Sequence, residues 1–135
     1  MSALVRLLYP PAVRSRQPVA VIGWWERRRL RYNLVVGGTG LVTLAVISAL
    51  GLVPPFPRTF LFPPAAVLVY AIMANLFYTA GWVSELVFNA WWREDPPAVG
   101  PVLFRQGLIF SVGLTLLPVG LAILEWGFRV VRWLF

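Results

Sequence analysis

The sequence has no cysteine, no histidine and no lysine, and charged residues make up only 13% of its 135 positions. Without cysteine the chain cannot form disulfides or use thiolate chemistry. Without histidine it lacks the commonest protein ligand of haem, zinc and copper. We therefore expect no metal and no cofactor of its own, and we keep only a bound phospholipid open as a small-molecule component.

The shortage of charge also bears on the solvent in which the chain folds. Soluble domains carry about a quarter charged residues, whereas here 59% of the residues are hydrophobic. A surface with so little charge would not stay dispersed in water. The composition therefore favours an integral membrane protein.

Three segments are long and apolar enough to cross a bilayer, which takes about 20 mainly apolar residues of helix. They are residues 33–53, 64–92 and 101–124. Pro54 and Pro55 end the first, because proline lacks an amide proton and clashes with the preceding helical turn. The fold class that we expect is all-α, an integral membrane protein with three transmembrane helices.

Four segments remain outside these spans. Residues 1–32 form an arginine-rich cytoplasmic or interfacial segment, 54–63 an external loop, 93–100 a cytoplasmic loop and 125–135 an interfacial tail. We expect the N-terminal and C-terminal segments to be amphipathic and to lie at the membrane surface.

The arginines predict the orientation. With the N-terminus inside, nine of the twelve lie on the cytoplasmic side, counting seven in residues 1–32 together with Arg93 and Arg105. This bias follows the positive-inside rule. Arginine without lysine is typical of a GC-rich genome, so we expect a multi-pass protein of the bacterial inner membrane with a cytoplasmic N-terminus. The net charge of +7 lies beside apolar spans, which favours anionic lipids or simple topology marking over nucleic acid.

The second span carries a polar stripe. Asn75, Tyr78, Trp82, Glu85 and Asn89 follow one another at spacings of three and four residues, which places them on one helical face. Such a face must meet protein or water rather than lipid. It indicates either hydrogen bonding between helices or the wall of a substrate or proton path.

Glu85 is the most informative residue of this stripe, because a charge inside the membrane costs about 3 kcal/mol. Arg105 enters the next span at a similar depth, so we expect a Glu85–Arg105 ion pair, supported by Asn89 and Gln106. Asn33 and Asn75 are expected to join the first two helices. A lone carboxylate acting as a proton carrier is the alternative. A metal site formed by Glu85, Glu94 and Asp95 is a weaker alternative.

Aromatic and basic residues gather at the predicted ends of the spans, where tryptophan and arginine meet lipid headgroups. Glu26 is expected to pair with an arginine one turn away. The residues assigned to the headgroup region are Trp24, Trp25, Arg27, Arg28, Arg29, Arg31, Trp91 and Trp92.

Two stretches carry a resemblance. The run from Trp25 to Asn33 and the later run from Ala74 to Tyr78 resemble small uncharacterised multi-pass proteins of bacterial inner membranes. The resemblance covers about a fifth of the chain. It implies a location and no activity.

Small residues predict surfaces on which helices pack closely. Those assigned to helix packing are Gly37, Gly40, Gly107, Ser111 and Gly113. Since three helices bury few faces, we expect a non-enzymatic accessory or structural subunit that packs against other membrane proteins or against itself. The alternatives are a small oligomeric transporter or channel that uses the polar stripe, and an intramembrane enzyme that uses Glu85.

Overall fold

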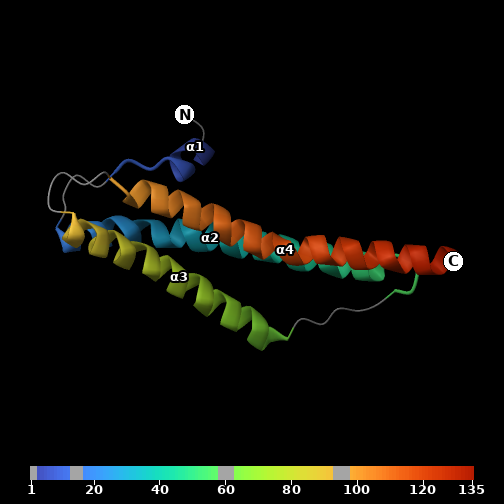
Figure 1. Cartoon of the computed structure of the whole chain (residues 1–135). Helices are drawn as coiled ribbons and strands as arrows, with labels where there is room; N and C mark the ends of the chain where they lie inside the picture. Colours follow the sequence, from blue (N-terminus) through green and yellow to red (C-terminus); the bar gives the residue numbers. More distant parts are fainter. Residues whose placement is uncertain (1–2, 13–16, 58–62, 93–97) are drawn as a thin grey trace.

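The computed structural model describes residues 3–12, 17–57, 63–92 and 98–135, and all the regular structure in these ranges is helical. The four helices are α1 (Ala3–Leu8), α2 (Pro18–Leu52), α3 (Pro64–Trp91) and α4 (Gly100–Leu134), as Figure 1 shows. The predictions that fall on residues 58–62 and 93–97, including Glu94 and Asp95, lie outside the described residues.

Three of the helices are long and apolar enough to cross a membrane, namely α2, α3 and α4. The all-helical class and the three expected spans are therefore confirmed. The chain is a membrane protein by the length and the composition of these helices.

Two of the helices extend beyond the spans that hydropathy indicates. The α2 helix begins at Pro18 and α4 ends at Leu134, whereas the apolar spans begin at Asn33 and end at Leu124. The intervening residues are mostly Arg, Glu, Leu, Val and Trp, and the only proline among them is Pro18, the first residue of α2, where proline is tolerated. Arginine, leucine and glutamate have high helix propensity, so the helices continue past the point where the apolar sequence stops.

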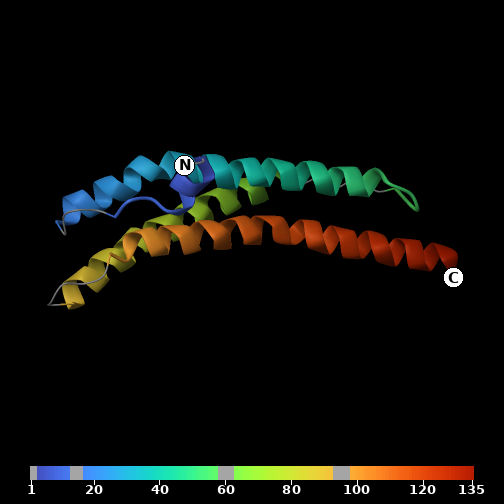
Figure 2. The same cartoon turned by 90° about the horizontal axis from the view of Figure 1, so that it is seen from above.

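The long helices α2 and α4 run side by side in the same direction, and α3 runs in the opposite direction, back to the end at which both of them begin (Figures 1 and 2). We call the end that holds Pro18, Trp91 and Gly100 the arginine-rich end. The opposite end, which holds Leu52 and Leu134, is called the proline end. The short α1 packs on α4.

The third helix does not reach the proline end. The Asn33 and Asn75 side chains meet at 3.2 Å, so these residues lie level in the two antiparallel helices. From there α3 extends 11 residues back to Pro64 and α2 extends 19 residues on to Leu52. At 1.5 Å per residue, α3 stops about 12 Å short of the end of α2. The bundle therefore has three helices at the arginine-rich end and two at the proline end.

The core follows one stripe of α2. Apart from Trp24, its buried positions between Val21 and Ile47 recur at spacings of four and seven residues, which keeps them on one face. They are Val21, Trp25, Tyr32, Val36, Thr43 and Ile47. On α4 the corresponding stripe is Gly100, Phe104, Leu108, Ser111 and Thr115.

Arg129 closes the proline end. Only 4% of this residue is exposed, and its guanidinium donates hydrogen bonds to the backbone oxygens of Leu50 at 2.9 Å and Phe56 at 3.0 Å. It also faces the Glu125 carboxylate at 3.5 Å. The last carbonyls of a helix lack intrahelical partners and carry the negative end of the helix dipole. Arg129 of α4 therefore caps the C-terminus of α2.

The substitution Arg129→Leu removes this cap and leaves buried carbonyls without a donor. We expect it to lower the free energy of unfolding by about 1–3 kcal/mol, measured by titration from mild detergent into SDS. Arg132, which lies 5.7 Å from the Phe56 ring on an exposed part of α4, provides the control. An equal loss in Arg132→Leu would show that the effect comes from charge alone.

Candidate functional site

Glu85 lies at the centre of the arginine-rich end, where α2, α3 and α4 meet. The residue is 3% exposed, and its carboxylate accepts a hydrogen bond from the indole Nε1 of Trp25 at 2.5 Å. The carboxylate also rests against Gly100, the first residue of α4, where an added Cβ would come within 2.6 Å of both carboxylate oxygens. A carboxylate is stabilised beside a helix N-terminus by the helix dipole.

An aromatic cluster surrounds this carboxylate. The Trp25 ring lies 5.3 Å from the Tyr78 ring and 6.0 Å from the Phe104 ring, in edge-to-face arrangements. Trp24 and Tyr32 extend the cluster, at 5.5 Å from Trp25 and 4.7 Å from Tyr78. Such pairs contribute about 0.5–1.5 kcal/mol each beyond the burial of their area. The aromatic cluster thus joins all three long helices.

The expected Glu85–Arg105 ion pair is not formed. The ion pairs between described residues join Arg29 to Glu26 and Arg129 to Glu125, and the Arg105 guanidinium lies over the Tyr9 ring at 5.1 Å. Arg105 is five residues after Gly100, which places it about 140° further around α4. It therefore faces the N-terminal segment instead of α3.

Trp24 and Trp25 do not face lipid headgroups, contrary to the sequence-based expectation. They are 4% and 2% exposed, and Trp24 donates from Nε1 to the Pro11 oxygen at 2.8 Å. The expectation failed because α2 begins at Pro18, and its buried positions start well before the apolar span, which begins at Asn33. Trp91 and Trp92 are exposed, as are Arg27 and Arg31.

The other two arginines of this segment make contacts within the bundle. Arg28 donates to the Trp24 oxygen at 2.8 Å and stacks over its ring at 3.9 Å. Arg29 pairs with Glu26 at 2.7 Å, as expected, and donates to the Thr79 hydroxyl at 3.2 Å. The second contact fixes α2 to α3.

Most of the polar stripe of α3 is occupied by contacts with α2. Asn75 accepts a hydrogen bond from Asn33 at 3.2 Å, and the Tyr78 hydroxyl donates to the Trp25 backbone oxygen. Trp82 is half-buried, and its Nε1 has no hydrogen-bond partner among the described residues. Asn89 is half-buried too, whereas Gln106 on α4 is exposed. The stripe is thus mainly a helix-joining surface.

Hydroxyl groups continue this polar contact toward the middle of the bundle. The Tyr32 hydroxyl shares a 2.8 Å hydrogen bond with Ser111, and the Tyr70 hydroxyl contacts that of Thr115. Thr43 donates to the Thr115 backbone oxygen at 2.9 Å. Beyond Thr43, the buried positions of α2 are Ile47 and Gly51. The series of hydroxyls thus ends at Thr43, nine residues before the end of α2.

The small residues assigned to packing fall into two groups. Ser111 is buried, and a Cβ at Gly40 would lie 3.9 Å from Thr115, so these two serve contacts between α2 and α4. An added Cβ at Gly37, Gly107 or Gly113 would meet no atom within 4 Å. These three glycines therefore make no close contact with another helix.

Two glycines that the sequence did not single out are the ones that the site requires. A Cβ at Gly81 would come within 2.8 Å of the Trp25 ring, and one at Gly100 would contact Glu85. Their role depends on contacts between helices, which sequence spacing does not show. The four- and seven-residue recurrence of Trp25, Tyr32 and Val36 was the available signal for the core.

This arrangement fixes the position of Glu85. Its carboxylate is enclosed by Trp25 and the first turn of α4, and no group of three potential metal ligands occurs among the described residues. The site can therefore hold a helix N-terminus in place through a buried carboxylate.

A double-mutant cycle of Trp25→Phe and Glu85→Gln tests this contact. We expect a coupling free energy of about 1–3 kcal/mol, as for a hydrogen bond to a charged group. The same cycle between Glu85→Gln and Arg105→Gln should give less than about 0.5 kcal/mol. Stronger coupling to Arg105 than to Trp25 in SDS unfolding would contradict the geometry.

Comparisons with models of known families, with curated proteins and with solved structures gave no match for this chain.

Proposed function

We propose that the chain is a non-enzymatic accessory or structural subunit of a membrane protein assembly, and that it binds its partner through the outward face of α4. One observation carries the proposal: a groove on this helix with a glycine floor and apolar walls, which the chain itself leaves uncovered.

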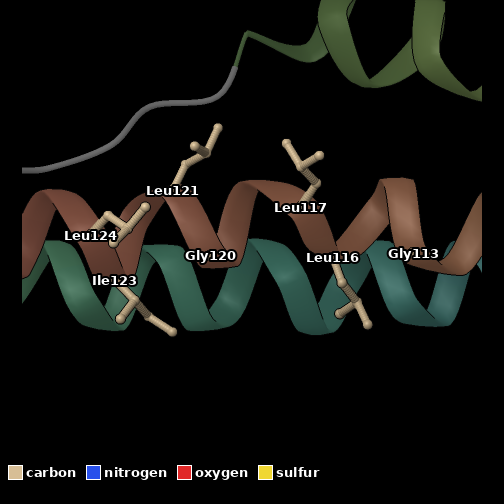
Figure 3. Close-up of a pocket in the computed structure, with 7 residues that line it drawn as sticks. All are labelled: Gly113, Leu116, Leu117, Gly120, Leu121, Ile123 and Leu124. Atoms are coloured by element: carbon tan, nitrogen blue, oxygen red, sulfur yellow. The ribbon is translucent and has the colours of Figure 1, made fainter.

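The floor of the groove consists of Gly113 and Gly120 (Figure 3). Leu117 and Leu121 lie along one side of it, and Leu116 and Ile123 lie along the other. Gly113 is two residues from both Ser111 and Thr115, which are buried against α2. Two residues correspond to about 200° of rotation, so the groove points away from the bundle.

The spacing of the two glycines suits the approach of a partner helix. Gly113 and Gly120 are seven residues apart, and no atom lies within 4 Å of a Cβ added at either. Small residues at such spacing let helix backbones approach closely in membranes. Seven-residue repeats fit helices that cross at about 20°. The α4 groove therefore fits an apolar transmembrane helix of a partner, either another membrane protein or a second copy.

The transport alternative has less support. A path along α3 would need its polar stripe to face water, but Asn75 and Tyr78 are hydrogen-bonded to α2. Glu85 is enclosed at the start of α4, which also disfavours an intramembrane enzyme.

The cellular placement is part of the same proposal. The nine-to-three distribution of arginine favours the arginine-rich end on the cytoplasmic side. The use of arginine without lysine favours a bacterial inner membrane. The exposed Arg27 and Arg31 are then available to anionic lipid headgroups.

The groove is tested by photo-crosslinking from benzoylphenylalanine at position 117, followed by mass spectrometry in mild detergent. We expect a discrete cross-linked membrane protein, lost at least fivefold in Gly120→Leu because leucine fills the floor. Gly38→Leu is the matched control, since Gly38 is exposed on α2 with equally open space.

Two results would contradict the proposal. One is a cross-link that survives Gly120→Leu unchanged. The other is a chain that stays monomeric and without cross-links in native membranes. A cross-link between two copies would identify the chain itself as the partner.

A further inference from the structure

A second cavity lies between α3 and α4 near the arginine-rich end, away from the α4 groove. Its volume is about 310 Å³. Its lining comes from all three long helices and is mostly aromatic or aliphatic. The residues that matter here are Trp25, Phe77, Gly81, Gln106, Gly107 and Phe110.

Two glycines create this space. Gly81 of α3 and Gly107 of α4 both line the cavity. The Trp25 ring fills the space beside Gly81, where a Cβ would come within 2.8 Å of it, and forms part of the cavity floor. At Gly107, by contrast, an added Cβ would meet nothing within 4 Å. Glycines in two helices normally permit close contact. Here α3 and α4 do contact one another, but they leave open space beside Gly107.

The cavity opens toward the bilayer. Phe77 and Phe110, which lie at its edge, are 59% and 64% exposed. None of the lining residues is charged. A mainly apolar cavity without charged groups takes a hydrocarbon more readily than an ion.

Gln106, a polar residue at the cavity, lies at the depth expected for the ester carbonyls of a lipid. Gln106 is exposed, and its amide has no hydrogen-bond partner among the described residues. The neighbouring Phe104 ring lies 6.0 Å from Trp25, and Ser111 binds Tyr32. Gln106 is therefore level with the arginines of residues 27–31, which prefer the headgroup region. Lipid ester carbonyls lie just below the headgroups.

From these observations, we propose that the α3–α4 cavity binds one acyl chain of a bilayer phospholipid, with its ester carbonyl accepting a hydrogen bond from Gln106. The acyl chain then lies against Trp25, Phe77 and Phe110 and fills the open space between α3 and α4. Since no charged side chain lines the cavity, the site selects the acyl chain and not the headgroup charge. It is independent of the proposed partner at the α4 groove.

Native mass spectrometry of the delipidated full chain in detergent tests this site. The probes are palmitoyl-oleoyl phosphatidylcholine and palmitoyl-oleoyl phosphatidylglycerol. We expect one tightly retained lipid per chain with similar affinity for both. Gly107→Leu should lower its occupancy at least fivefold, because the leucine side chain enters the cavity and its Cβ meets no atom within 4 Å. Gly38→Leu should leave it unchanged, since Gly38 is an equally open glycine outside the cavity and outside the α4 groove.

A second measurement covers the case in which Gly107→Leu does not fold. The chain has no cysteine, so Gly107→Cys and Gly38→Cys each carry a single thiol. Either lipid should slow the reaction of N-ethylmaleimide with position 107 severalfold and leave position 38 unaffected. Three results would overturn the proposal. They are retention of phosphatidylglycerol alone, equal lipid retention in Gly107→Leu and the unmodified protein, and equal protection of both thiols.

Discussion

The burial of one carboxylate determines the arrangement of the arginine-rich end. Glu85 is enclosed by the Trp25 indole and the first residue of α4. A charge in such a position is tolerated only when donors and dipoles compensate for the lost hydration. To provide them, α2 must contribute Trp25 and α4 must begin at Gly100. The position of each long helix is thereby set by a group on another helix.

The proline end uses the opposite charge for the same purpose. Arg129 of α4 lies at the C-terminus of α2, where the helix dipole is negative. An anion at one helix start and a cation at one helix end therefore fix the two extremities of the bundle. Between them the contacts are neutral, from the hydroxyls of Tyr32 and Ser111 to the apolar Ile47. This order keeps full charges away from the middle of the apolar spans.

The sequence was sufficient for the class of the fold and for the three spans, because both depend on length and hydropathy. It also identified Glu85 and the polar stripe, since a carboxylate in an apolar span requires a partner. The predicted partner of Glu85, Arg105, was wrong. Spacing along the chain shows which residues share a face, but it does not show which helix that face meets. Arg105 lies five residues beyond Gly100, which Glu85 contacts, and it faces the N-terminal segment. Trp25 had been assigned to the headgroup region because tryptophan is common there.

The short reach of α3 has a consequence for the surrounding bilayer. Three helices lie side by side at the arginine-rich end, and α2 and α4 alone continue to the proline end. The molecule is therefore tapered along its long axis. Lipids beside the proline end must spread or tilt to fill the space that a third helix would occupy. The cost of embedding the chain alone then depends on lipid shape and local curvature, and a companion helix on the narrow side would remove that dependence.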